Sequence, residues 1–408
     1  MKKNKRKTGA LVSLMLICFL TLSTFTGCES YENFKDAFID KEGLVEETVR
    51  IGVYEPLSGA DKEYGELEKM GIELGNELFP TALGKKVELL YFDNKSDIYI
   101  AETVVKEMVD KRVALVLGSY GSVNSLMAVS LLEAASIPAI TITNTNPLVT
   151  SYNPFYFRVT YTDAFQGVAL AKYVVEGMAL KNAAVMKPLN NDFAAAVSKS
   201  FSNKMIQLSE DTGSILISED YVSGKKDYAE QLRKISESGA KAVFLPADVK
   251  DAVRIISQAS EMKLNLTFLG TDEWASEKLT DLKMEDPNIK IVYATLVKSE
   301  DGDNPLSEAF LRAFHSKYGE DQEPSDATAL AFDAYLIGID SINRAGTALD
   351  GNAIRLALKE TMQYKGVSGT ISFDEQGDPI KSVAIKGIAK GTTERIFTVE
   401  PTWVVLEI

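Results

Sequence analysis

The stretch that decides the fold spans residues 115–150, LVLGSYGSVNSLMAVSLLEAASIPAITITNTNPLVT. Apolar, β-forming runs at 113–117 and 137–142 flank a segment long enough for a helix. This succession of strand, helix and strand is typical of a parallel βαβ unit buried on both faces. Neighbouring strands of such a unit end side by side, and ligands bind in the crevice beyond their carboxyl ends. The sequence therefore predicts a ligand site at the two turns that follow these strands.

The two turns, 119–125 and 141–147, are polar and carry no charge. Ser122 is predicted to be the N-cap of the helix, where its hydroxyl and the free backbone N–H groups can hold a carboxylate. Thr143, Asn144 and Thr145 add hydroxyl and amide groups in the second turn. An alternative interpretation is that Ser122 only caps a helix and that NTNP is an ordinary turn. Taken alone, either turn leaves both interpretations open.

The rest of the chain alternates strands and helices, as α/β proteins do. Strands are predicted at 49–54, 87–92, 155–159, 183–186, 215–218, 242–245, 266–269 and 291–297. Helices are predicted at 64–78, 98–109, 165–178, 193–208, 228–238 and 251–262, followed by three without intervening strands at 305–318, 327–344 and 353–362. The end is β again, at 369–378, 382–388, 396–399 and 404–406. About 360 residues exceed what one hydrophobic core supports, so two α/β lobes joined by several crossings are predicted.

The N-terminus, residues 1–27, has the pattern of a targeting segment. Five cationic residues precede an apolar stretch at 10–22 that is short for a membrane span. The sequence FTGC at 25–28 is similar to a bacterial lipobox, which predicts cleavage before Cys28 and lipidation of its sulfur. Phe25 departs from the aliphatic residue of that motif, and an ordinary secretory signal is the alternative. Residues 28–48 are predicted to be a tether, with a short helix around 31–38.

Charge and cysteine content exclude several classes of protein. Removing the signal takes away five positive and no negative residues, which moves the formal net charge from −14 to −19. Such an acidic chain is repelled by nucleic acid and by anionic lipid headgroups, so membrane attachment is expected only through the lipid on Cys28. The mature chain keeps one cysteine and forms no internal disulfide.

Catalytic and metal-binding patterns are not found in the sequence. The single histidine, His315, lies far from both polar turns, and no nucleophile elbow, paired-histidine metal site or phosphate-binding loop occurs. We therefore expect no enzyme activity, no metal and no cofactor.

From residue 49 onward the chain resembles the class I periplasmic binding proteins, specifically the branched-chain amino acid (leucine, isoleucine, valine) binding components of ABC transporters. The matching segments are IGVYEPLSGADKEYGE, LGSYGS, PAITITNTNP, FYFRVTYTDAFQG, NDFAAA, FLGTDEW and GVSGTISFDEQGDP. Each is short and weak alone, but all seven occur in the family's order across about nine tenths of the chain.

The resemblance implies two Rossmann-like lobes joined by three hinge crossings, with the ligand in the cleft between them. The implied N-terminal lobe comprises residues 49–162 and 297–367, and the C-terminal lobe comprises 163–296 and 368–408. The crossings are expected near 159–165, 294–298 and 366–371. Such a hinge permits closure around a ligand.

The resemblance also implies roles for individual residues. Ser122 and the backbone of Thr145 hold the ligand carboxylate, whereas Thr143, Thr145 and Asp272 hold its ammonium. Tyr64 covers the ligand side chain, and Phe193 lies at the mouth of the second lobe. The alternatives are a solvated loop acid for Asp272 and ordinary core packing for Tyr64 and Phe193.

Three departures from the family bear on ligand choice. Tyr120 occurs where branched-chain binders have a smaller apolar residue, Asp248 occurs where relatives place an aromatic residue, and Phe193 lacks a tyrosine hydroxyl. Tyr120 would shrink or polarise the pocket. Asp248 would favour a cationic or polar ligand side chain, or else lies on the surface.

The sequence thus predicts an extracytoplasmic, lipid-anchored, monomeric binding protein that captures a small ligand and delivers it to an ABC permease. An amino acid is the favoured ligand. The alternatives are a ligand sensor of the same fold that acts on a receptor or signalling partner, or a binder of a non-amino-acid carboxylate or amide.

Overall fold

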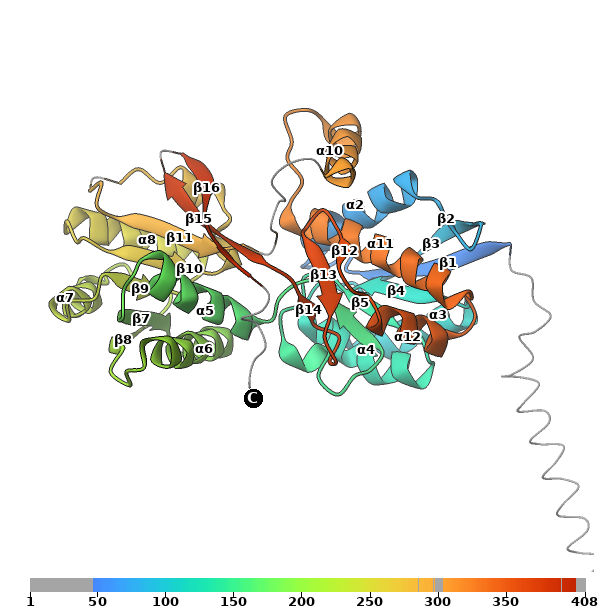
Figure 1. Cartoon of the computed structure of the whole chain (residues 1–408), viewed down its shortest axis with the longest axis horizontal. Coiled ribbons are helices and arrows are strands. Elements are labelled where there is room, and N and C mark those ends of the chain that lie inside the picture. Colours follow the sequence, from blue (N-terminus) through green and yellow to red (C-terminus); the bar gives the residue numbers. More distant parts are fainter. Residues whose placement is uncertain (1–46, 285, 296, 298–303, 390, 401–408) are drawn as a thin grey trace, which may run out of the picture. The chain divides into compact units, whose positions relative to one another are not determined.

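The computed structural model describes residues 47–284, 286–295, 297, 304–389 and 391–400 (Figure 1). The predicted signal peptide, Cys28, most of the tether and the predicted strand at 404–406 lie outside these residues. Among the helices that the structure describes, none is both long and apolar enough to cross a membrane.

The first lobe is built on a six-stranded sheet of order β2-β3-β1-β4-β5-β6. Its strands are β1 (Thr48–Glu55), β2 (Thr81–Ala82), β3 (Lys85–Asp93), β4 (Leu115–Gly118), β5 (Ala139–Thr141) and β6 (Tyr156–Arg158). All neighbours pair parallel except β2 with β3. All residues of β4 and β5 are buried, as expected for a parallel sheet covered on both faces. With α4 (Ser122–Ala134) between them, the predicted βαβ unit is confirmed.

Helices cover both faces of this sheet. On one face lie α2 (Lys62–Leu78), α10 (Pro305–Tyr318), α11 (Asp326–Ala345) and α12 (Gly351–Lys359), and on the other lie α3 (Ala101–Asp110) and α4. Helices α2 and α11 approach closely because Gly71 lacks a side chain. A Cβ atom at Gly71 would lie only 2.1 Å from the carbonyl oxygen of Thr328. The three consecutive helices predicted late in the chain are confirmed, and all three belong to the cover of the first lobe's sheet.

The second lobe is built on a seven-stranded sheet of order β16-β15-β11-β10-β9-β7-β8. Its strands are β7 (Ala183–Pro188), β8 (Ile215–Tyr221), β9 (Ala242–Phe244), β10 (Thr267–Gly270), β11 (Lys290–Ala294), β15 (Val383–Ala389) and β16 (Thr392–Val399). Strands β7 to β11 are parallel, whereas β15 and β16 are antiparallel. Helices α5 (Asp163–Lys172) and α6 (Asp192–Ser209) cover one face, and α7 (Ala229–Glu237) and α8 (Val249–Glu261) cover the other. The predicted α/β fold with two Rossmann-like lobes is confirmed.

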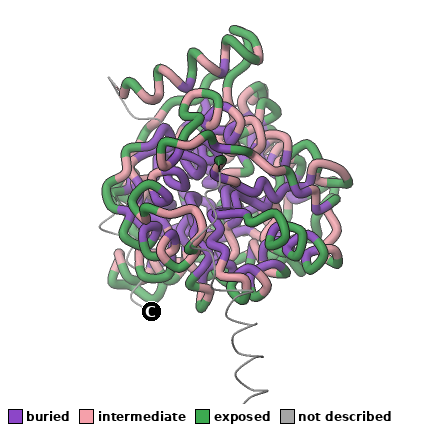
Figure 2. Tube along the Cα trace, turned by 90° about the vertical axis from the view of Figure 1, so that its right-hand side faces the viewer, coloured by how far each residue is buried: buried purple, intermediate pink, exposed green. Residues whose placement is uncertain are grey.

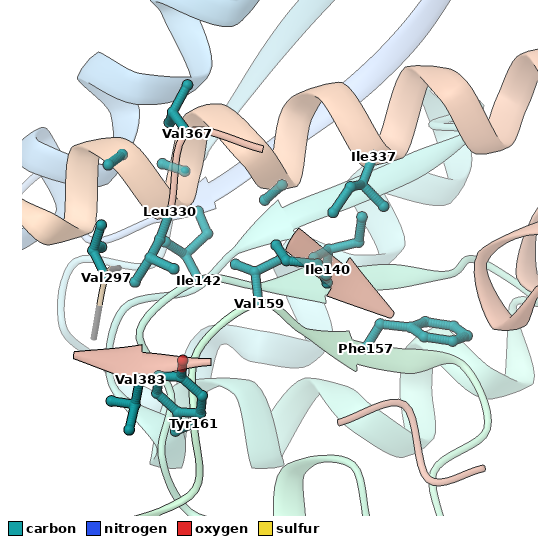
Figure 3. Packing of buried hydrophobic residues seen from close by; sticks show 14 of the residues in the cluster. Ile140, Ile142, Phe157, Val159, Tyr161, Val297, Leu330, Ile337, Val367 and Val383 are labelled. Atoms are coloured by element: carbon teal, nitrogen blue, oxygen red, sulfur yellow. The ribbon is translucent and has the colours of Figure 1, made fainter. Parts of the chain in front are cut away.

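The chain crosses between the lobes at 159–162, at 295–304 and at 381–382. Apolar residues from both lobes pack together around the crossings, among them Val159, Tyr161, Val297 and Val383 (Figure 3). Buried residues follow the interior of the chain trace and exposed ones its outside (Figure 2). Val159, Tyr161, Val297 and Val383 are therefore part of the hydrophobic core.

The third crossing occurs later in the chain than the predicted 366–371. A small antiparallel sheet of β12 (Tyr364–Lys365), β13 (Thr370–Phe373) and β14 (Pro379–Ile380) precedes it. This sheet lies against the first lobe, because the ring of Phe373 packs on Phe157 and the N–H of Arg158 donates to the carbonyl of Gly377. Only at Val383 does the chain join the second sheet.

Candidate functional site

The first half of the candidate site lies where three neighbouring strands of the first sheet end. Strands β1, β4 and β5 end at Glu55, Gly118 and Thr141, and the two predicted polar turns follow β4 and β5. The Asn144 side-chain amide donates to Ser125 Oγ at 2.5 Å, and the N–H of Asn146 donates to Ser122 Oγ at 3.4 Å. The structure therefore brings the two turns together, as the sequence predicted.

The N-cap prediction for Ser122 was wrong by one residue. Helix α4 begins at Ser122, and its N-cap is Gly121, whose φ of 84° suits glycine. Among the described residues no side chain caps this helix. The first backbone N–H groups of α4 and the Ser122 hydroxyl thus share one end of the helix, where the helix dipole favours an anion.

The two threonines of the second turn both direct their hydroxyl protons to carboxyl groups. Thr143 donates to Glu68, and the Thr145 side chain hydrogen-bonds Asp163. Asp163 is the first residue of α5, so this contact joins the turn to the start of the second lobe. Burial raises the pKa of Asp163, against the opposing effects of Thr145 and Arg158.

Arg158 anchors the second turn from behind, and the sequence analysis missed it. Its side chain is fully buried at the end of β6. It donates to the carbonyl of Asn144 at 2.9 Å, to Thr150 Oγ1 at 2.6 Å and to Asp378 Oδ1 at 2.6 Å. The signal was the arginine within the apolar strand sequence FYFRV, since an arginine in a buried strand needs several acceptors.

Tyr64 and Tyr120 form a stacked pair at the edge of this half-site. Their ring centroids are 4.6 Å apart, and the ring planes differ by 6°. Tyr64 stands on α2 and is 49% exposed, so it is not a core residue. The predicted alternative of ordinary core packing therefore does not describe Tyr64.

The second half of the candidate site is a cavity of 260 Å³ at the carboxyl ends of β7, β8 and β9. Phe193, Asp248 and Glu273 line it, together with Tyr221 and neighbouring loop residues. The Tyr221 hydroxyl is buried and has no hydrogen-bond partner among the described residues. Asp248 is exposed and also caps α8, because it accepts a 2.8 Å hydrogen bond from the N–H of Asp251.

Asp272 stands beside this cavity rather than in its lining. It begins the short helix η4 (Asp272–Trp274), and its N–H donates to Gln166 Oε1 at 3.0 Å. Burial, followed by repulsion from Asp326 and Asp163, raises the pKa of Asp272 to about 6, although the Gln166 side chain opposes the shift. In the free protein Asp272 therefore releases its proton less readily than an ordinary aspartic acid does.

Carboxyl groups of both lobes act on the same region. Burial raises the pKa of Glu273 to about 7, and the negative charges of Asp272, Asp248 and Asp163 add to the shift. Glu273 in turn contributes to the raised pKa of Tyr120, whose largest cause is burial. A carboxyl group of the second lobe thus acts on Tyr120 in the first lobe. Acidic side chains predominate in this region.

Two buried glutamates, Glu55 and Glu68, complete the first half-site, and the sequence analysis missed both. Glu55 ends β1 and accepts from the N–H of Tyr120 at 2.8 Å, whereas Glu68 accepts from Thr143. The available signal was helical spacing: Glu68 shares a buried stripe of α2 with Gly65, Gly71, Ile72 and Gly75.

Within the described residues, no group of three or more His, Cys, Asp or Glu side chains is arranged to hold a metal ion. His315 lies on α10 near Glu320 and Glu323, with nitrogen–oxygen distances of 3.9 and 3.8 Å. It takes no part in either half of the candidate site.

Residues 48–392 match the model of a protein family described as periplasmic binding protein. The chain is 25% identical over 344 residues to the leucine-, isoleucine-, valine-, threonine- and alanine-binding protein of Pseudomonas aeruginosa, covering 82% of this chain and 88% of the relative.

Solved structures of binding proteins are also similar to this chain. The structure of a leucine-binding protein from Thermotoga maritima is similar with a TM-score of 0.71 and 28% identity, over 87% of this chain and 99% of that one. A branched-chain amino acid transporter substrate-binding protein from Streptococcus pneumoniae, in complex with isoleucine, matches with a TM-score of 0.69 and 26% identity, over 87% of this chain and 100% of the other.

Proposed function

This chain belongs to the periplasmic binding protein family, and from that membership we propose that it captures an amino acid outside the cytoplasm and delivers it to an ABC permease. The names of its relatives favour an amino acid with an aliphatic side chain. The observation that carries the proposal is the set of hydrogen bonds that the hydroxyl groups of the two polar turns already make. Some of these hydroxyl groups remain able to donate and others only to accept.

Ser122 is placed to donate. Its oxygen already accepts from the N–H of Asn146, which leaves its proton for another acceptor. The first N–H groups of α4 point the same way along the helix axis. We assign Ser122 and this helix end to the ligand carboxylate.

Thr143 and Thr145 are placed to accept. Each gives its hydroxyl proton to a carboxyl group, Glu68 or Asp163, so that only oxygen lone pairs remain for a ligand. Oxygen lone pairs suit an ammonium group. We assign both threonines to the ligand ammonium, with Asp272 and Asp163 as the charged partners that a buried cation needs.

The side chain of the ligand is assigned to the region between the Tyr64–Tyr120 pair and the cavity at Phe193. Partners on both lobes make the closed form the one that the ligand favours. We assign every part of this site to binding the ligand and no part to a catalytic step.

We further propose that Cys28 carries the lipid that holds the domain at the extracytoplasmic face of the membrane. Full-length protein expressed in a bacterial host is expected in the membrane fraction, and the Cys28→Ser variant in the soluble fraction. Equal membrane content of the two proteins would contradict lipid anchoring without bearing on ligand binding.

A thermal-shift screen of residues 48–408 against the twenty amino acids, short peptides, amides and small carboxylates tests the ligand assignment. A ligand at about a hundred times its dissociation constant should stabilise the domain by roughly 2.7 kcal/mol. Calorimetric titration then gives the dissociation constant of each hit. If no α-amino acid raises the melting temperature, the amino acid proposal is overturned.

The Ser122→Ala variant, with Ser130→Ala as its control on the exposed face of the same helix, tests the carboxylate assignment. Loss of one hydrogen bond to a charged group should weaken binding by roughly tenfold or more. Ser130→Ala should bind like the unaltered protein, and equal affinity of both variants would contradict the assignment.

A further inference from the structure

Glu55 and Glu68 form a carboxyl pair directly behind the two polar turns. Both residues have 0% exposure, although they come from different elements, the end of β1 and the inner face of α2. The two carboxyl groups are close enough that each affects the pKa of the other. Fully buried glutamates are rare unless a partner compensates their charge.

The hydrogen bonds of the pair account for only part of its oxygen atoms. The N–H of Tyr120 donates to Glu55 Oε2, and the hydroxyl of Thr143 donates to Glu68. Glu55 Oε1 and Glu68 Oε2 receive no donor from any other described residue. A carboxylic acid proton on Glu55, donated to Glu68, supplies the missing hydrogen bond between the two groups.

Among the described residues, no Lys, Arg or His contributes to the shifted pKa of Glu55 or Glu68. The titratable groups next to the pair are Tyr54 on β1 and Tyr120 in the first turn. Tyr120 is in turn affected by Tyr64 on α2, by Asp61 just before that helix and by Glu273 of the second lobe. None of the ion pairs found among the described residues involves Glu55 or Glu68. Two ionised carboxylates in contact there would lack any compensating partner.

We propose that Glu55 and Glu68 are positioning residues for the ligand site, and that they hold the two polar turns in place only while the pair carries a proton. The proton completes a chain from the Tyr120 N–H through Glu55 and Glu68 to the Thr143 hydroxyl. This chain fixes the turn after β4 relative to the turn after β5. Ligand affinity is thereby coupled to pH. The coupling to affinity rests on the proposed function, whereas the shared proton does not.

Electrostatics agrees with this arrangement. Burial, then the charge of Glu68, raises the pKa of Glu55 well above its ordinary value. Burial raises the pKa of Glu68 to about 7, while hydrogen bonds from Glu55 and Thr143 oppose the shift. The pair therefore keeps a proton to a higher pH than ordinary glutamates do, and alkaline pH is what breaks the chain.

The Glu55→Gln variant separates the proton from its hydrogen bonds. A glutamine carbonyl still accepts from the Tyr120 N–H, and its amide still donates to Glu68, but it cannot ionise. Glu55→Ala removes both bonds. Glu63→Gln, an exposed residue on the same helix as Glu68, is the matched control.

The first measurement uses L-leucine as the probe and follows its dissociation constant from pH 6 to pH 10. We expect Glu55→Ala to bind at least about tenfold more weakly at pH 7, and Glu55→Gln to restore most of that loss. At alkaline pH the affinity of the unaltered protein should fall relative to Glu55→Gln, approaching tenfold per pH unit. Comparing the two proteins at each pH cancels the titration of leucine itself. Glu63→Gln should follow the unaltered protein, and parallel pH profiles of Glu55→Gln and the unaltered protein would overturn the coupling.

The second measurement needs no ligand. Infrared difference spectra of the ligand-free domain between neutral and alkaline pH should show the carbonyl band of a buried carboxylic acid, absent in Glu55→Gln. Absence of this band from the unaltered protein would overturn the shared proton. A band without leucine binding would instead mean that the pair is correctly described and that the proposed ligand is wrong.

Discussion

Arg158 and Asp378 form an ion pair, 2.6 Å between Nε and Oδ1, that joins the end of β6 to the turn before β14. The arginine side chain is 0% exposed and that of the aspartate 24%. Because the same guanidinium also holds the carbonyl of Asn144, the pair fixes the backbone between Thr143 and Thr145. A contact that is distant in sequence thus supports the site.

Asp378→Ala should destabilise the domain and weaken ligand binding together. It leaves Arg158 buried without its hydrogen-bonded counter-ion, which costs about 3 kcal/mol or more. Urea unfolding at neutral pH measures the free energy. Glu237→Ala breaks the exposed Arg233–Glu237 pair and should cost at most about 0.5 kcal/mol. A loss for Asp378→Ala as small as that of Glu237→Ala would show that Arg158 does not depend on this partner.

Binding of an amino acid should strengthen as pH rises through about 6. In the free protein the pKa of Asp272 is about 6, raised chiefly by burial. An ammonium group beside Asp272 favours the ionised form, so binding below that pH must release a proton from it. Calorimetric titration from pH 4.5 to 8 checks this.

Asp272→Asn is the comparison for that experiment. It should bind roughly tenfold or more weakly at pH 7, because the charge-assisted hydrogen bond is lost. Its affinity should also stay nearly constant across the range in which the unaltered protein changes. A profile for Asp272→Asn that keeps the rise near pH 6 would assign the effect to another group.

The stability of the ligand-free domain should fall as pH rises from about 4.5 to 7, in part because of Glu68. The folded pKa of about 7 exceeds the ordinary value of 4.5, so the folded state binds more protons than the unfolded state between these values. The stabilisation is complete below the unfolded pKa and is lost as pH rises through the folded pKa. A shift of this size corresponds to about 3 kcal/mol as an upper bound.

Glu68→Gln should flatten this part of the stability profile, whereas Glu63→Gln should leave it unchanged. Thermal unfolding of the three proteins at intervals of half a pH unit gives the comparison, and other carboxyl groups cancel in the differences. Should the unaltered protein and Glu68→Gln lose stability in parallel, Glu68 would have to be ionised already at acidic pH.

Asp248→Asn distinguishes a ligand-binding charge from a helix cap. Asparagine caps helices as well as aspartate does, so the hydrogen bond to the N–H of Asp251 is kept and the melting temperature should hardly change. Only the negative charge at the cavity is lost. If Asp248 selects a cationic side chain, affinity for lysine or arginine should fall several-fold while that for leucine stays the same. If the substitution changes the affinities for lysine, arginine and leucine by the same factor, Asp248 does not select the ligand side chain and its capping role remains.

The sequence predicted the order of strands and helices well because the spacing of apolar residues determines it. The runs at 113–117 and 137–142 became the neighbouring strands β4 and β5, and the polar turns behind them meet as expected. The N-cap was misplaced because Ser122 and Gly121 are both good caps, and only the positive φ of Gly121 decides between them.

The supporting charges of the site were not predicted, because their burial is a property of tertiary packing. Glu55, Glu68 and Arg158 are ordinary charged residues in the sequence, and each becomes buried only when distant elements close over it. The third crossing was expected earlier for a related reason. The apolar residues of β13 fit either lobe by pattern, and the contact of Phe373 with Phe157 decides for the first.

Tyr120→Ala should widen the pocket and change the ligand preference. The ring of Tyr120 stacks on Tyr64 with 4.6 Å between centroids. In the proposed ligand site it would fill space that a ligand side chain could otherwise occupy. In a hydrophobic pocket each additional methylene that fits contributes roughly 1 kcal/mol or more to discrimination. The ratio of the dissociation constants for alanine and leucine should therefore move at least about fivefold in favour of leucine. Tyr99→Ala, at a tyrosine that is 84% exposed, should leave the ratio as it was. If Tyr120→Ala lowers affinity for both amino acids equally, the stacked pair covers the ligand without selecting its size.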